Sequence, residues 1–256
     1  MLGRLAAGAT GVVAPLLALE LLARSEVLPQ REVPPPSVWL QVLVQQLPAP
    51  AFWADVGSTL EGWAIGLTLA ALIAVPAGIL IGSSRLGYQM LRAPIEFLRP
   101  IPSVALIPLA VLVFGTRLQN KVFLVTFACL WPLLFQAIYG VQDVDPVAVD
   151  TARAFGFGRP ARLLRVVLPS AAPYLATGLR IASSVALILA VTSELVVGVP
   201  GLGRSINVAA SSGDYALMYA LIAVAGLLGL ALNAAFGRLE GWLLRWHPAQ
   251  RAEAPA

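Results

Sequence analysis

The side chains that most often do chemistry in proteins are scarce in this sequence. Cys129 is the single cysteine and His247 the single histidine, which excludes a disulfide framework, a Cys/His metal site and a nucleophile activated by histidine within the chain. Lys121, the single lysine, stands between Asn120 and Val122, whereas a phosphate-binding loop needs Gly-Lys followed by Ser or Thr. We therefore expect no enzyme activity and no cofactor in this chain, so any energy from ATP must come from a partner.

Glu194 is an ionisable residue in unfavourable surroundings. It follows Thr192 and Ser193 inside the apolar run from Leu175 to Gly198. A carboxylate at membrane depth is costly unless it faces protein or water, so we expect it to point inward. Arg180 lies about 21 Å away along a helix, too far to pair with it there. Glu194 either lines a polar path or is hydrogen-bonded as a structural brace, and the sequence leaves both open.

Prolines interrupt another apolar run, from Ile101 to Gly115. Pro100, Pro102 and Pro108 each remove a backbone donor, which lipid penalises unless the freed carbonyls face a cavity or a packed neighbour. Broken helices often line transport sites, where backbone dipoles and Ser103 could meet an anionic solute. A simple kink is the alternative explanation.

The composition points to a protein that resides in lipid. Hydrophobic residues make up 59% of the 256 and charged residues 12%, against an ordinary charged share of about 25%. Crossing a bilayer takes about 20 apolar residues in a helix. We therefore expect an all-α integral membrane protein with six transmembrane helices, the third one extended by Ile95 to Leu98. The runs are Leu5 to Ala23, Val56 to Gly82, Ile101 to Gly115, Val122 to Tyr139, Leu175 to Gly198 and Tyr215 to Phe236.

One transmembrane domain, 1–256, accounts for the whole chain. Residues 1–55 comprise an anchor helix and an outer segment, in which Val38 to Leu47 predict an amphipathic helix with Trp39, Phe52 and Trp53 as anchors at the headgroups. Residues 56–240 form the core of the helical bundle, and 142–173 form a large loop on one side of it.

The positive charges predict the orientation in the membrane, because Lys and Arg are retained on the cytoplasmic side. One set of alternate connections carries Arg4, Arg85, Arg92, Arg153, Arg159, Arg162, Arg165, Arg238, Arg245 and Arg251. The other set carries fewer, namely Arg24, Arg31, Arg117, Lys121 and Arg204. Both termini and the loop at 142–173 should therefore be cytoplasmic. This excess also explains the pI near 9.7 without any nucleic acid partner.

That loop is long, with about thirty residues between spans, and loops of this length are usually functional. Asp145 followed by Pro146 predicts a helix start, and the helix should run to about Phe155. Gly156 to Arg159 break it, Pro160 starts a second helix, and Leu168-Pro169 should end that one. The loop is thus expected to form a helix-turn-helix elbow with Gly156 at its corner.

Two pairs of glycines are spaced for close helix packing. Gly62 with Gly66, and Gly78 with Gly82, are small residues four apart on one run. The contact they allow lies either within one chain or between two copies.

Asp150 to Pro169 resembles the cytoplasmic EAA motif of permease subunits in bacterial ABC importers. The family pattern is Glu-Ala-Ala, three residues, Gly, nine residues, Ile, one residue, Leu-Pro. Ala152, Gly156, Leu168 and Pro169 match it, while Asp150, Thr151 and Val166 replace Glu, Ala and Ile at intact spacing. Further stretches resemble the nitrate, taurine and alkanesulfonate branch: STLEGWAIG from Ser58, PAGILIGSSR from Pro76, RPIPSVALIPL from Arg99, GLRIA from Gly178, SELV from Ser193 and PGLG from Pro200.

The resemblance implies a type I ABC importer permease of the inner membrane. Such a permease is a homodimer, with two ATPase subunits on the cytoplasmic side that bind ATP and Mg, and a substrate-binding protein outside. The elbow would be the coupling helix that docks in a groove of the ATPase. The expected coupling residues are Asp150, Thr151, Ala152, Arg153, Phe155, Gly156, Phe157, Gly158 and Arg159. For the solute pathway we expect Pro102, Ser103, Thr192, Ser193 and Glu194.

The resulting hypothesis is a permease that moves a small anionic solute, such as a sulfonate, taurine or nitrate, by alternating access. An importer of the same architecture for an aromatic or heterocyclic precursor is the alternative. A secondary transporter driven by ion gradients would need intramembrane acid or histidine relays, and an intramembrane hydrolase would need a Ser-His pair or a metal-ligand set. Neither requirement is met in the spans.

Overall fold

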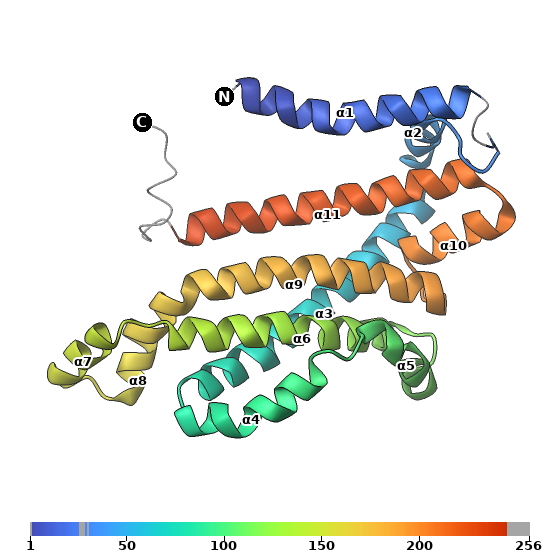
Figure 1. Cartoon of the computed structure of the whole chain (residues 1–256). Helices are drawn as coiled ribbons and strands as arrows, with labels where there is room; N and C mark the ends of the chain where they lie inside the picture. Colours follow the sequence, from blue (N-terminus) through green and yellow to red (C-terminus); the bar gives the residue numbers. More distant parts are fainter. Residues whose placement is uncertain (1, 26–28, 30, 245–256) are drawn as a thin grey trace.

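The protein is a bundle of long helices, described by a computed structural model at residues 2–25, 29 and 31–244. Within these residues the chain forms helices and turns without a strand, which confirms the predicted all-α class (Figure 1). The helices are α1 (Leu2–Arg24), α2 (Pro36–Gln46), α3 (Pro50–Gly82), α4 (Arg85–Leu98), the 3₁₀ turn η1 (Ser103–Leu106), α5 (Ile107–Phe114), α6 (Leu118–Gln142), α7 (Pro146–Ala154), α8 (Arg159–Arg162), the π-helical turn η2 (Leu163–Val167), α9 (Leu168–Val197), α10 (Leu202–Ser212) and α11 (Tyr215–Leu243).

Helix α6 occupies the centre, packed between α3 and α9. The core is built from apolar side chains of these three helices, among them Leu67, Val125, Leu133 and Ala186. Close packing depends on glycine. A Cβ added at Gly78 would lie 2.5 Å from the Ala137 Cβ and 2.8 Å from the Leu134 carbonyl oxygen.

The predicted glycine pairs therefore pack within one chain. Gly62 and Gly66 face Lys121 and Val125 of α6, and Gly82 faces the Ile138 backbone of the same helix. Of the two possibilities left open by the sequence, the contact within the chain is the one observed.

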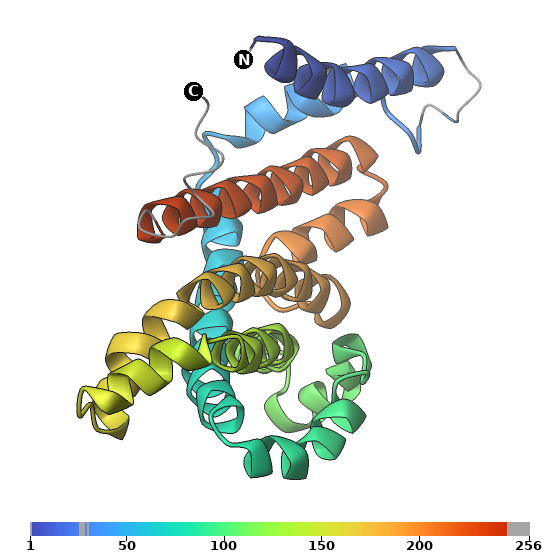
Figure 2. The same ribbon diagram turned by 60° about the vertical axis from the view of Figure 1, so that its left-hand side comes forward.

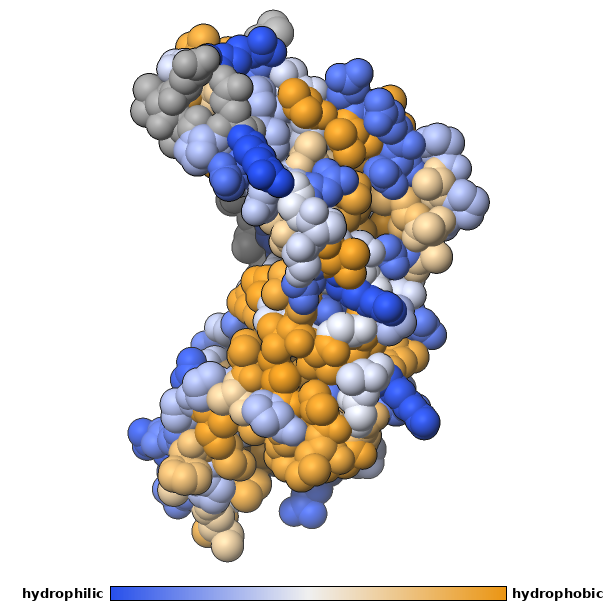
Figure 3. All heavy atoms as spheres, turned by 90° about the vertical axis from the view of Figure 1, so that its right-hand side faces the viewer, coloured by the Kyte–Doolittle hydropathy of each residue, from blue (hydrophilic) through white to orange (hydrophobic). Residues whose placement is uncertain are grey.

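Four helical segments of the described chain are long and apolar enough to cross a membrane. They are α3, α6, the continuous helix Arg159–Val197 and α11, and α4 with η1 and α5 adds a fifth if that bent pair is one span. Helix α1 is not among them, so its membrane insertion stays a prediction. Large apolar side chains on these helices are exposed, including Leu72 at 66% and Leu230 at 68%. Figure 3 shows such side chains over a broad part of one face, as a surface in contact with lipid requires.

The N-terminal helices lie to one side of the core (Figure 2). Helix α1 packs against α2, where the Glu20 carboxylate accepts hydrogen bonds from the Ser37 N–H and hydroxyl. The amphipathic helix predicted at Val38 to Leu47 is α2. The prediction of headgroup anchors is wrong for Trp39 of α2 and Phe52 of α3, because both side chains are buried against protein. Trp53 of α3 is 56% exposed.

The third predicted span is not one helix. Helix α4 ends at Leu98, and the segment from Ser103 to Phe114 turns away from it by 76° (Figure 2). Pro100 and Pro102 lie in the break, where no helical hydrogen bond is required of them. Pro108 does not kink α5, because it occupies the first turn of this helix, a position that tolerates proline.

The prediction that Leu168-Pro169 ends a helix is also wrong. Helix α8 continues through η2 into α9, giving one helix from Arg159 to Val197. Proline inside a helix lacks a donor and clashes with the carbonyl four residues earlier, here that of Arg165. The wider π turn at Leu163–Val167 accommodates this mismatch just before Pro169, so the helix is not broken.

We predict opposite effects of alanine at two glycines of α3. Gly57 has open space around it, so Gly57→Ala should be neutral or stabilise by up to about 1 kcal/mol through helix propensity. Gly78→Ala should destabilise by about 1–3 kcal/mol, because its methyl group overlaps α6. Thermal denaturation of the purified protein in detergent measures both, and equal midpoints would contradict the packing described for α3 and α6.

Candidate functional site

The elbow is formed by local capping interactions. Asp145 caps α7 by accepting a hydrogen bond from the Val147 N–H at 2.8 Å, and Pro146 takes the first helical position. At the other end Gly156 has φ +77°, the left-handed conformation that glycine adopts without strain. The Phe157 N–H then donates to the Ala152 carbonyl and the Gly156 N–H to the Arg153 carbonyl, each at 3.0 Å. The predicted start of the first helix and its break at Gly156 are therefore confirmed.

The outward face of the elbow has charged and aromatic side chains side by side. Phe155 is 79% exposed, and a Cβ built at Gly156 meets no atom within 4 Å. Asp150 and Arg153 form an exposed pair at 3.2 Å. Aromatic side chains are enriched in the surfaces through which proteins bind partners.

Two of the other predicted coupling residues, Ala152 and Phe157, pack into the elbow. Ala152 is buried, and Phe157 is half-buried with the Arg165 guanidinium 5.5 Å from its ring centre. The Thr151 hydroxyl donates to the Val147 carbonyl at 2.7 Å, so it is used within α7. Gly158 and Arg159 are exposed where α8 begins.

A hydrogen bond joins the two helices from which the elbow protrudes. Asp143 directly follows α6, and the Tyr174 hydroxyl of α9 donates to its carboxylate at 2.7 Å. The elbow thus leaves the bundle from two helices held together at their bases.

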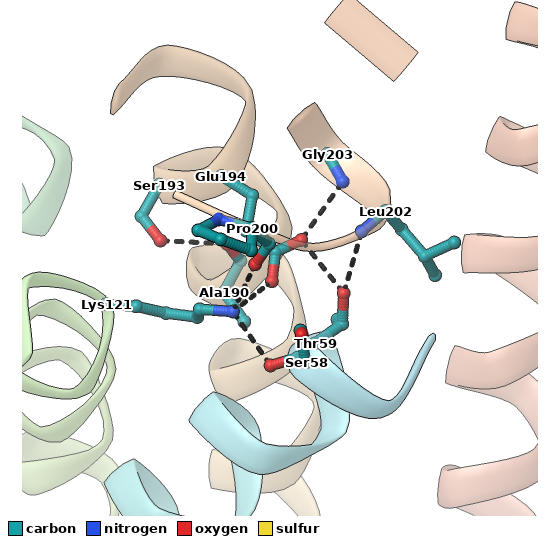
Figure 4. A network of polar contacts seen from close by, with 9 residues as sticks. All are labelled: Ser58, Thr59, Lys121, Ala190, Ser193, Glu194, Pro200, Leu202 and Gly203. Atoms are coloured by element: carbon teal, nitrogen blue, oxygen red, sulfur yellow. Dashed lines mark hydrogen bonds and ion pairs between the residues drawn. The ribbon is translucent and has the colours of Figure 1, made fainter. Parts of the chain in front are cut away.

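At the opposite end of the bundle Glu194 forms a buried ion pair with Lys121. The Lys121 Nζ lies 2.6 Å from Glu194 Oε1, and the two side chains are 1% and 0% exposed (Figure 4). Nζ also donates to the carbonyls of Ser58 at 2.8 Å and Pro200 at 3.0 Å. The other carboxylate oxygen accepts from the Thr59 hydroxyl at 2.9 Å and the Gly203 N–H at 3.0 Å.

This network joins α3, α6, α9, the loop after α9 and the start of α10. Two glycines allow the close approach: Gly201 at the end of the loop has φ +144°, and a Cβ at Gly203 in the first turn of α10 would lie 2.8 Å from the Glu194 Cβ. Every hydrogen-bonding atom of the carboxylate and the ammonium is engaged, as a buried pair requires. The geometry therefore favours the structural brace for Glu194 over a side chain that lines a path.

The remaining predicted pathway residues do not converge with Glu194 on one site. Thr192 donates its hydroxyl to the Ile188 carbonyl, and Ser193, fully buried, donates to the Ala190 carbonyl. Pro102 and Ser103 lie at the break before η1. A role for these residues in solute passage stays a prediction.

Lys121 is the residue that sequence reasoning missed, because we counted it with the outer connections. It lies in the first turn of α6 instead. A lone lysine near the start of an apolar run was the available signal. Cys129 is buried, its thiol directed at the Ala182 carbonyl, and His247 lies outside the described residues.

Comparison with known proteins identifies the family. Residues 74–246 match the family described as binding-protein-dependent transport system inner membrane component. The chain belongs to this family. Since its members are permease subunits of ABC importers, this chain is a transport subunit rather than an enzyme, and it works with ATPase and binding-protein partners.

Several curated permeases are similar over most of this chain. The nitrate import permease protein NrtB of Leptolyngbya laminosa is 32% identical over 186 residues, 73% of this chain and 66% of that protein. The bicarbonate transport system permease protein CmpB of Synechococcus elongatus is 32% identical over 76% of this chain and 69% of that protein. The taurine transport system permease protein TauC of Escherichia coli is 31% identical over 84% of this chain and 80% of that protein. The match thus spans about two thirds of the first two relatives.

Solved structures show the same fold. A chain of the MetNI methionine ABC transporter in an inward-facing conformation superposes with a TM-score of 0.66 at 21% identity, covering 76% of this permease and 98% of that chain. An amino acid ABC transporter gives 0.63 at 18% identity. The predicted type I ABC importer permease fold is therefore confirmed.

We predict strong coupling between Lys121 and Glu194 in a double-mutant cycle. Glu194→Gln and Lys121→Met should each destabilise the permease by about 3–5 kcal/mol, because each leaves one buried charge without its counter-ion. The double variant should lose less than the sum of the two, because no charge then remains unpaired. Thermal denaturation in detergent provides the measurement.

Glu96→Gln is the matched control, because it removes an ion pair in which both side chains are more than half exposed. This variant should change the midpoint little. Additive losses in the Lys121 and Glu194 cycle would show that the pair contributes no interaction of its own.

Proposed function

We propose that two copies of this permease form the translocation path of an ABC importer in the inner membrane. Two ATPase subunits bind on the cytoplasmic side at α7 and the corner after it, and a substrate-binding protein delivers the solute outside. The observation that carries this proposal is the elbow, because its exposed Phe155 and open Gly156 corner form a docking surface outside the spans. ATP and Mg would be bound by the ATPase subunits.

Charge distribution supports this orientation. In Figure 1, α7 and α8 lie at one end of the bundle, and α5 and α10 lie at the other. The end with α7 and α8 carries Arg153, Arg159, Arg162 and Arg165. Since arginines are retained on the cytoplasmic side, the elbow faces the cell interior, and both termini do as well.

The geometry supports transmission of movement from the elbow through the membrane. The helix from Arg159 to Val197 has 39 residues, about 58 Å at 1.5 Å per residue. Its outer part carries Glu194, which holds α3 and α6. A shift of the elbow when the ATPase subunits close would therefore move α9 together with α3 and α6, as alternating access by a rigid group of helices requires.

The solute we propose is a small molecule with an oxyanion group, such as nitrate, taurine or another sulfonate. Nitrate, bicarbonate and taurine are the solutes in the names of the similar permeases. Each of them carries a small, negatively charged group of oxygen atoms. An aromatic or heterocyclic precursor, the alternative solute, would be carried by a permease of the same fold, but it is not defined by such an oxyanion group.

A substitution at the corner should uncouple the permease. We predict that Gly156→Asp leaves the protein inserted but reduces ATP hydrolysis stimulated by the loaded binding protein to its basal level, because a charged side chain enters the docking surface. The measurement is ATPase activity of the full complex reconstituted in vesicles.

Gly213→Asp is the matched control. Gly213 ends α10 with φ +76° and open space around it, so the backbone strain is the same, but it lies at the opposite end of the bundle. This variant should keep its stimulation. Wild-type stimulation with Gly156→Asp would contradict docking at the corner, and equal loss in both variants would assign the effect to strain.

The binding protein of this importer should retain an oxyanion. Purified without added ligand and denatured, it should release a sulfonate, nitrate or bicarbonate, which mass spectrometry and ion chromatography identify. Recovery of a neutral aromatic or heterocyclic compound would contradict the proposed solute class while leaving the importer intact.

A further inference from the structure

Lys121 and Arg180 lie within the spanning helices α6 and α9, and each of them is paired with a carboxylate. Lys121 pairs with Glu194 at 2.6 Å. Arg180 of α9 lies 3.7 Å from Glu240 of α11. In the part of the chain that the structure describes, Arg99 has no carboxylate within ion-pair distance, and its side chain is exposed.

Arg99 is held by an aromatic ring instead. Its guanidinium carbon lies 4.6 Å from the centre of the Phe135 ring, a cation–π contact. Phe135 precedes the end of α6 at Gln142 by seven residues, about 10 Å along the helix. The guanidinium therefore lies alongside α6, about 10 Å from the end of that helix, rather than beyond it.

The broken span positions this charge. Arg99 directly follows α4, and its N–H donates to the Ile95 carbonyl as the last helical bond. Pro100 and Pro102 then prevent the helix from continuing, and the chain turns by 76°. An arginine facing lipid without a counter-charge is costly, so a side chain fixed here must meet an anion or water.

We propose that Arg99 binds the oxyanion group of the solute as it passes the bend between α4 and α5. The contact with Phe135 holds the guanidinium carbon near the ring, and the side chain remains exposed, so its N–H groups are available to an anion. The N–H edge of a guanidinium matches two oxygens of a nitrate, carboxylate or sulfonate group in a bidentate arrangement, which a lysine ammonium does not reproduce. This inference rests on the proposed import of an oxyanion.

Arg99→Gln and Arg99→Lys test the assignment in the reconstituted importer with its ATPase and binding protein. Arg99→Gln should lower the uptake rate of the oxyanion solute by about tenfold or more, since a charge-assisted pair is lost. ATP hydrolysis stimulated by the loaded binding protein should persist, because the elbow is unchanged. Arg99→Lys should recover only part of the rate, because it keeps the positive charge but loses the planar pair of N–H donors.

Phe135→Leu and Arg92→Gln separate binding from folding. Phe135→Leu removes the ring that orients the guanidinium and should also slow uptake, with thermal stability near that of the wild type. Arg92→Gln removes another exposed arginine, on α4 and already paired with Glu96, and should leave uptake unchanged.

The outcomes distinguish this inference from the proposed function. If the wild type takes up no oxyanion although its ATPase is active, the proposed solute class fails. Should the wild type and Arg99→Gln take up the solute equally fast, only the role of Arg99 fails. A lipid phosphate as the anion would appear as phospholipid that co-purifies with the wild type and not with Arg99→Gln, at equal uptake, and this result would overturn the assignment.

Discussion

A pair of opposite charges without access to solvent joins the helices of this permease at the end of the bundle opposite the elbow. Lys121 and Glu194 come from α6 and α9, and their remaining hydrogen bonds go to α3, to Pro200 in the loop after α9 and to Gly203 in the first turn of α10. Lipid supplies no hydrogen bonds, so a polar group there must find its partners in the protein. The glycines at positions 201 and 203 allow this close approach, because a side chain at either position would overlap Glu194.

This pair lies near one end of a helix whose other end forms the elbow. Because Arg159–Val197 is continuous, a displacement at the elbow is not absorbed by a joint within the membrane. The Tyr174 and Asp143 hydrogen bond also ties the start of α9 to the end of α6. The bend between α4 and η1 is different: there the α-helical hydrogen bonds of α4 end, and the Arg99 guanidinium contacts Phe135. The molecule thus combines a stiff connection between its two sides with one irregular segment suited to contact a solute.

Features set by neighbouring residues could be predicted from the sequence. The bounds of α7 follow from Asp145, Pro146 and Gly156, whose effects act within one helical turn. The prediction that a helix ends at Leu168-Pro169 was wrong. The π turn before Pro169 makes room for the proline ring within the helix, and such a turn has no simple signal in the sequence.

Long-range partners could not be predicted in the same way. Lys121 and Glu194 are 73 residues apart, and only the packing of α6 between α3 and α9 brings them together. Sequence reasoning required that Glu194 face inward but could not name its partner. The contact of Arg99 with Phe135 was inaccessible for the same reason, because it depends on how α4 ends relative to α6.

The central claim is that the elbow projects into the cell interior and there contacts the ATPase. The single native thiol, Cys129, is fully buried, so Phe155→Cys adds one exposed thiol at the tip of the elbow. Its reaction with a membrane-impermeant maleimide should be compared in inside-out and right-side-out vesicles, with and without the ATPase subunits. Labelling is expected only in inside-out vesicles, with protection by the bound ATPase. Labelling from the outer side, or labelling from the inner side that the ATPase leaves unchanged, would contradict docking of the ATPase at a cytoplasmic elbow.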